Sequence, residues 1–187
     1  MRSTSVLQSQ NKIGSSIRLP IISLLLGAAC ALIFWIFGAI PSTLIFHAEE
    51  GQRAWQWLSS HWVHISKQHL IWNVAALLML GSLIEQTSRL LVLAALALGI
   101  LGVNFYLALF YSLDAYAGLS GALNSLLVIA LYCLYQRPDY RAAAVITLIL
   151  SIAKIFVEML IQTSLFSKLP WPPVPVSYTH LTLPTKA

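Results

Sequence analysis

Five long apolar stretches, separated by polar ones, dominate the pattern of this chain. They cover about residues 21–40, 69–84, 90–111, 119–135 and 142–161. A helix needs about 20 apolar residues to cross a bilayer, and these stretches approach or reach that length. Because a spanning segment must satisfy its own backbone hydrogen bonds, all five are predicted to be α-helices. The pattern therefore predicts an all-α, polytopic membrane helix bundle.

The segments around these stretches differ in character. Residues 1–19 are polar and predict an N-terminal tail, and residues 20–176 form the predicted membrane domain. Residues 41–60 are too polar to cross the bilayer, and their tryptophans suit a membrane–water interface. A proline-rich loop over 162–176 follows the fifth stretch, and residues 177–187 read unlike the rest of the chain. We expect these last residues to be a non-native tail.

Composition supports the membrane class. The chain is 58% hydrophobic and only 9% charged, whereas a soluble domain carries about 25% charged residues. The net charge of +5 does not indicate nucleic-acid binding, because the basic residues are scattered.

The distribution of basic residues predicts the orientation. With the N-terminal tail in the cytoplasm, more Lys and Arg lie inside than outside, as the positive-inside rule expects. The inside residues are then Arg2, Lys12, Arg18, Arg89, Arg137 and Arg141, and the outside residues are Arg53, Lys67 and Lys168.

The two cysteines, Cys30 and Cys133, lie inside apolar stretches. They are interpreted as small buried side chains, and neither a disulfide nor a cysteine-based metal site is predicted.

A polar side chain in a membrane span costs free energy, so each such residue is a candidate for a functional role. One such group runs from Gly118 to Asn124. In it, Ser120 lies near the start of the fourth stretch and is flanked by Gly118 and Gly121. Small neighbours allow a second backbone, either a packed helix or a peptide substrate, to approach closely. Taken alone, the motif favours helix packing over a nucleophile, because short motifs often match by chance.

The second polar group precedes and enters the second stretch. His69 and Asn73 are four residues apart, so a helix places both on one face. Two donors facing a serine could stabilise the oxyanion of acyl transfer, or they could hydrogen-bond across helices. His61 and His64 precede them and could be interfacial residues. A metal site formed with His69 is a third alternative, disfavoured because no zincin-type carboxylate accompanies the histidines.

Together, the two groups resemble the paired motifs of rhomboid intramembrane serine proteases, over about residues 20–176. The motifs are His64-x4-His69-x3-Asn73-x7-Gly81-x3-Glu85 and Gly118-Leu119-Ser120-Gly121. The resemblance implies a six-helix bundle in which Ser120 is the nucleophile and His69, Asn73 and the backbone hold the oxyanion. It also implies that Gly118 and Gly121 contact the substrate, and that no metal or cofactor is needed.

Within this family the chain most resembles the rhombosortase branch. This resemblance to the branch rests on the compact length, on residues 61–64 just before the second stretch, on residues 118–123, and on Lys154 with Glu158 in the fifth stretch. Asn124 departs from the branch, many members of which carry histidine there. Lys154 and Glu158 are four residues apart and are predicted to pair on one helical face.

The resemblance places the general base on a sixth span, which this sequence is expected to lack or to have replaced. His180 falls where that histidine should lie, either as the base of a truncated chain or by coincidence. We therefore expect this 187-residue chain to be poorly active, because a short tail does not position a base.

Two functions are compatible with the sequence. The first is a serine endopeptidase that cleaves membrane-anchored proteins, with exported bacterial proteins carrying C-terminal Gly-Gly sorting tails as the implied substrates. It would act in the bacterial inner membrane. The alternative is a non-catalytic rhomboid-like protein that binds transmembrane clients. A transporter is less favoured, since no internal repeat is visible.

Overall fold

Long helices make up most of the computed structural model, which describes residues 18–39, 41, 43–47, 53–110 and 115–161. The long helices are α1 (Ile21–Phe37), α3 (Lys67–Glu85), α4 (Arg89–Phe110), α5 (Ser120–Tyr135) and α6 (Arg141–Ile161). The short elements are α2 (Gln56–Ser59), the 3-10 helix η1 (Pro138–Tyr140), β1 (Phe46–His47) and β2 (Ala115–Tyr116). The predicted all-α class is confirmed.

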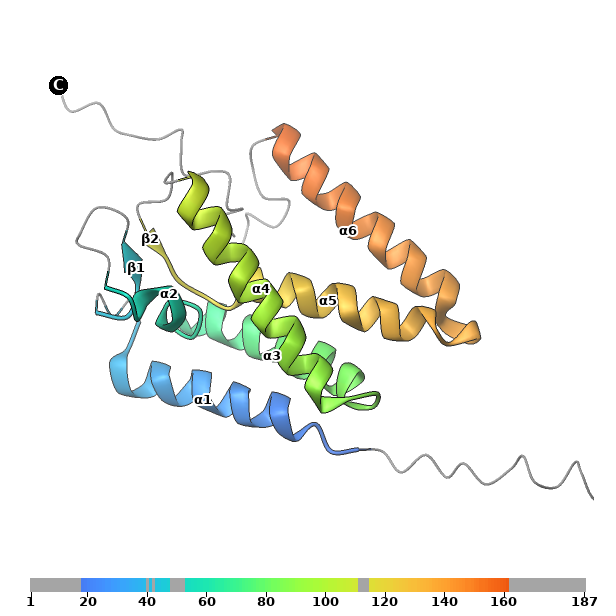
Figure 1. The fold of residues 1–187 in the computed structure, drawn as a ribbon, viewed down its shortest axis with the longest axis horizontal. Helices are drawn as coiled ribbons and strands as arrows, with labels where there is room; N and C mark the ends of the chain where they lie inside the picture. The colour runs from blue at the N-terminus through green and yellow to red at the C-terminus, as the bar shows by residue number, and fades with distance from the viewer. Residues whose placement is uncertain (1–17, 40, 42, 48–52, 111–114, 162–187) are drawn as a thin grey trace, which may run out of the picture.

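Helix α5 lies inside the bundle, in contact with α3, α4 and α6 (Figure 1). Its buried side chains join those of α3 and α4 in one apolar core, which includes Leu77, Ile84, Val92 and Leu126. Helix α6 packs on α5 and extends along the outside of the bundle. The core therefore centres on the helix that begins at Ser120.

Helices α4 and α5 approach each other closely at a glycine. A Cβ atom on Gly99 would lie 2.7 Å from the Cα atom of Ala122. One turn away, the Ser125 hydroxyl donates to the carbonyl oxygen of Ala95 at 2.5 Å. A small residue and an interhelical hydrogen bond are typical of helix packing in membranes.

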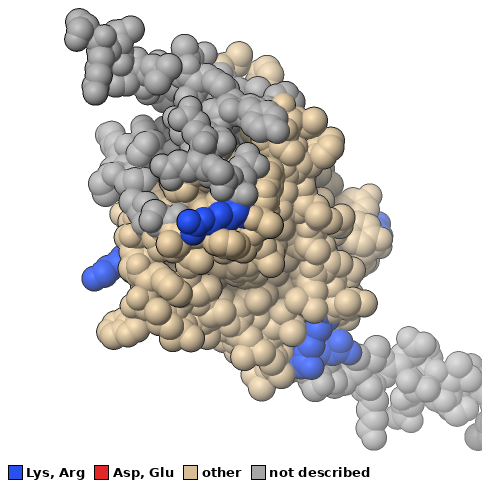
Figure 2. Space-filling model, turned by 60° about the vertical axis from the view of Figure 1, so that its left-hand side comes forward, with Lys and Arg blue, Asp and Glu red and all other residues tan. Residues whose placement is uncertain are grey.

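The surface of the bundle is that of a membrane protein. In the described part of the chain, three helical segments are long and apolar enough to cross a bilayer: Lys67–Glu85, Arg89–Leu109 and Pro138–Val157. Helices α1 and α5 are shorter apolar helices. Lys and Arg form isolated groups on an otherwise uncharged face in Figure 2. Large apolar side chains such as Trp35 and Leu160 are exposed, as lipid contact requires.

A small antiparallel ladder lies at one end of the bundle. Phe46 pairs with Tyr116 and His47 pairs with Ala115, so β1 is tied to β2. The ladder links the segment before α2 to the segment before α5. The pattern of residues 41–60 predicts an interfacial segment but did not predict this strand pairing. The pairing positions the segment that leads from β2 to Ser120.

Several sequence predictions concern residues that the structure leaves undescribed. Residues 1–17 and 162–187 lie outside the described part, and they include most of the N-terminal tail, the proline-rich loop and His180. The side chain of Glu158 is also not described, so the predicted pair with Lys154 remains a prediction.

Candidate active site

Ser120 is the first residue of α5, and its side chain is exposed. The first N–H groups of a helix have no partner within the helix, and the helix dipole makes that end partially positive. A negative charge that develops on or next to Ser120 would therefore be stabilised by the start of α5.

Gly118 connects Ser120 to the rest of the site. Its φ angle is +123°, a conformation that residues with a side chain rarely adopt. Its N–H donates to the Ser60 carbonyl oxygen at 2.8 Å, and its own carbonyl accepts from the Tyr116 hydroxyl at 2.9 Å. A Cβ atom at position 118 would lie 2.6 Å from Cε1 of His69. Glycine therefore lets the imidazole lie directly against this segment.

His69 and Asn73 share one face of α3, as the sequence predicted. The Ser66 hydroxyl caps this helix by accepting from the His69 N–H at 3.1 Å. Asn73 Nδ2 and His69 Nε2 are 2.9 Å apart. Since an amide nitrogen only donates, Nε2 accepts this bond, and the proton of the imidazole then lies on Nδ1. The two side chains thus meet each other and, through His69, the Gly118 segment.

His64 lies beside His69, with 5.2 Å between the ring centroids. Its side chain is buried, and this burial lowers its pKa to about 4, with a smaller contribution from the neighbouring His69. His64 is therefore neutral at pH 7. Both of its ring nitrogens are buried and make no hydrogen bond within the described chain.

His61 belongs to a separate network that sequence reasoning did not find. Its Nε2 lies 3.0 Å from Oδ1 of Asn104, whose Nδ2 donates to the Trp57 carbonyl oxygen at 3.0 Å. Its ring also lies 5.1 Å from that of Tyr116, centroid to centroid. Burial lowers the pKa of His61 as well. The signal for Asn104 was its position as a polar residue within an apolar stretch, whereas nothing in the sequence singled out Tyr116.

Buried polar atoms with open hydrogen-bonding capacity gather in this region. Within the described residues, no partner is found for Ser60 Oγ, His61 Nδ1, the two His64 ring nitrogens, His69 Nδ1 and His47 Nε2. A buried polar atom without a partner costs about 1–3 kcal/mol, so such a group indicates a place where water or a polar ligand binds.

Gly121 faces α4 and Tyr116. A Cβ atom there would lie 3.0 Å from the Tyr116 hydroxyl oxygen. Gly121 also lines a hollow of about 290 Å³ together with residues of α4, namely Gly99, Gly102, Val103 and Tyr106. The structure thus gives Gly121 a packing environment, and its predicted substrate contact stays a prediction.

The metal alternative finds no support in the described residues. No group of three or more His, Cys, Asp or Glu side chains there is arranged to hold a metal ion. Cys30 and Cys133 are both free and buried.

The fold and this polar cluster define an integral membrane helix bundle in which an exposed serine follows Gly118, the residue against which the partly buried His69 lies. The family model of the Rhomboid domain matches residues 51–179, and the chain therefore belongs to the rhomboid family. Comparisons with curated proteins and with solved structures gave no match.

Proposed function

We propose that this protein is an intramembrane serine endopeptidase in which Ser120 is the nucleophile. The observation that carries the proposal is the contact of the His69 imidazole with Gly118, two residues before the exposed Ser120. Membership of the rhomboid family, whose members are generally intramembrane serine proteases, supports the same chemistry.

In the proposed reaction, the Ser120 hydroxyl oxygen attacks the carbonyl carbon of the scissile peptide bond. Its proton passes to a general base, for which His180 is the candidate. The negative charge moves to the carbonyl oxygen, where N–H groups at the start of α5 and donors from His69 and Asn73 would stabilise it. The base returns the proton to the leaving amine, and water then hydrolyses the acyl-enzyme.

Open hydrogen-bonding capacity around His64 and His69 supports the last step, because hydrolysis needs water at the serine. Asn73 donates one N–H of Nδ2 to His69, which leaves the second N–H of this amide for an oxyanion. His69 Nδ1–H is not engaged by a described residue and is a second side-chain donor.

For the substrate class, we propose exported bacterial proteins with a C-terminal Gly-Gly sorting tail, cleaved in the inner membrane with the N-terminus of the protease in the cytoplasm. This assignment rests on the rhombosortase-like features at residues 61–64 and 118–123 and at Lys154. It is tested with a membrane-anchored reporter carrying such a tail and a second reporter in which both glycines are leucine.

The nucleophile is tested by labelling the 187-residue chain in detergent with a fluorophosphonate probe. We expect weak labelling, in keeping with the poor activity expected of this chain, that Ser120→Ala abolishes and the control Ser151→Ala retains. Ser151 lies on α6 and bonds its own helix at Thr147, so its loss changes a hydroxyl away from the site.

His180→Ala separates the base from the nucleophile. If His180 is the base, this variant labels as poorly as Ser120→Ala. Equal labelling of the His180→Ala and parent chains would assign the base elsewhere. Absence of Ser120-dependent labelling, together with photo-crosslinking to a transmembrane peptide by both the parent and Ser120→Ala chains, would favour the client-binding alternative.

A further inference from the structure

Two arginines line a polar hollow at the end of the bundle where α1 begins and α3 connects to α4. The hollow has a volume of about 420 Å³ and is lined by Arg18, Thr87, Ser88, Arg89 and Leu90. The ladder of β1 and β2 lies at the opposite end of the bundle (Figure 1). The hollow is therefore separate from the candidate active site.

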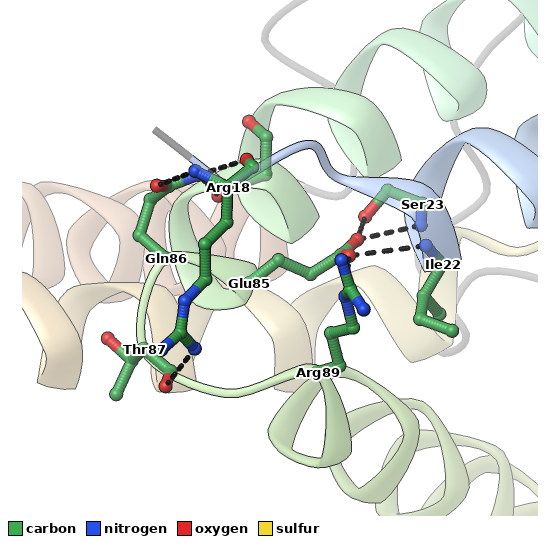
Figure 3. Close-up of polar contacts among 8 residues, drawn as sticks. Arg18, Ile22, Ser23, Glu85, Gln86, Thr87 and Arg89 are labelled. Carbon is green, nitrogen blue, oxygen red and sulfur yellow. Dashed lines mark hydrogen bonds and ion pairs between the residues drawn. The ribbon is translucent and has the colours of Figure 1, made fainter. Parts of the chain in front are cut away.

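The segment before α1 is fastened to the α3–α4 connection beside this hollow. The backbone N–H of Arg18 donates to Gln86 Oε1 at 3.0 Å, and Gln86 Nε2 donates to the Arg18 carbonyl oxygen at 2.8 Å. The guanidinium of Arg18 also donates to the Thr87 carbonyl oxygen at 3.4 Å (Figure 3). These three bonds hold Arg18 against the connection, where it lines the hollow together with Arg89.

Glu85 offsets only part of the positive charge of the two arginines. Its buried carboxylate accepts from the Ser23 N–H at 2.8 Å, the Ser23 hydroxyl at 2.6 Å and the Ile22 N–H at 3.2 Å. Arg89 approaches it only through Nε, at 3.8 Å (Figure 3). Glu85 thus mainly caps the start of α1. Each guanidinium has five N–H donors, and most of those on both arginines are not engaged by described residues.

We infer that this hollow binds the phosphate of an anionic phospholipid. A phosphate accepts from two guanidinium groups at once, with charge-assisted hydrogen bonds. Basic pockets at the ends of membrane helices bind anionic lipid headgroups. Leu90 lines the hollow and is 72% exposed, and Leu19, next to Arg18, is 69% exposed. These leucines offer apolar surface for acyl chains, which free phosphate would not use.

The test is native mass spectrometry of the full chain in a neutral detergent, titrated with phosphatidylglycerol or with phosphatidylcholine of the same acyl chains. We expect tighter binding of phosphatidylglycerol. A surface arginine contributes about fivefold to the affinity for anionic lipid, so Arg18→Gln should weaken binding about fivefold and the double variant with Arg89→Gln about 25-fold. Arg18→Gln alone also serves if the double variant does not fold.

The matched control is Arg137→Gln with Arg141→Gln, which removes the same charge from the α5–α6 connection. This control should keep the preference for phosphatidylglycerol. An equal loss in both double variants would show a general charge effect and overturn the site. Displacement of phosphatidylglycerol by inorganic phosphate at equal concentration would overturn the assignment to lipid, as would equal binding of the two phospholipids.

Discussion

The hydroxyl of Tyr116 donates a 2.9 Å hydrogen bond to the carbonyl oxygen of Gly118, two residues before Ser120. Tyr116 is itself paired with Phe46 in the β1–β2 ladder. Burial raises the pKa of Tyr116 far above its usual value near 10, so its hydroxyl stays protonated and remains a donor. The ladder, which is remote in sequence from α3, thereby fixes the segment against which His69 lies.

Tyr116→Phe should loosen this segment while leaving the aromatic packing in place. Loss of a neutral hydrogen bond costs about 1 kcal/mol, and more where the carbonyl stays buried and unpaired. We expect slower fluorophosphonate labelling of Ser120 with a decrease of a few degrees in the unfolding temperature. Tyr132→Phe, on the exposed side of α5, is the control. Labelling of Tyr116→Phe at the parent rate would contradict a positioning role.

Gly118→Ala should have a larger effect. The new Cβ would lie 2.6 Å from His69 Cε1, and the φ angle of +123° disfavours any side chain. Such strain costs about 1–3 kcal/mol. We expect strongly reduced labelling of Ser120 and a lower unfolding temperature. Gly102→Ala is the matched control, because a Cβ there meets nothing within 4 Å. Similar behaviour of the two variants would argue against the contact with His69.

Asn104→Ala tests the network around His61. The change leaves the Trp57 carbonyl oxygen and His61 Nε2 without the bonds that Asn104 makes. Unpaired buried groups cost about 1–3 kcal/mol each, so the unfolding temperature in detergent should fall clearly. Asn124→Ala, which alters an exposed amide on α5, should change it little. If Asn104→Ala and Asn124→Ala both unfolded at the temperature of the parent chain, the network around His61 would not contribute to stability.

Hydrophobic patterning could predict the helices of this protein because a membrane span must be both apolar and helical. The segments near 69–84 and 142–161 correspond to α3 and α6. The first segment was expected to reach residue 40, whereas α1 ends at Phe37. Gly38 follows, with φ +73° and ψ −164°, a non-helical conformation that is open to glycine because it has no Cβ atom. Periodicity alone does not reveal such an end.

The candidate site was predictable only in part. Helical spacing correctly placed His69 and Asn73 on one face. The contacts of Ser60 with Gly118, of Tyr116 with Phe46 and of Asn104 with Trp57 join residues that are far apart in the sequence. Single-sequence patterns carry no information on such pairs. The roles of Ser120 and His180 in catalysis remain predictions that the labelling experiments address.

Acidification should destabilise the protein through His64. Its pKa is about 4 in the folded state against 6.5 for an unperturbed histidine, because burial disfavours the charged form. Between pH 6.5 and 4 the unfolded chain therefore binds more protons than the folded chain, and stability falls as the pH falls through this window. The loss from this one group is at most about 3 kcal/mol. It is measured as the unfolding temperature in detergent at pH 7.5, 6 and 4.5. His64→Phe removes this titrating group and should reduce the dependence, while the part that comes from His61 remains, because burial lowers the pKa of His61 as well. The unfolding temperature of the variant at pH 7.5 shows whether it folds. A pH dependence as steep in His64→Phe as in the parent chain would show that the sensitivity arises at other groups.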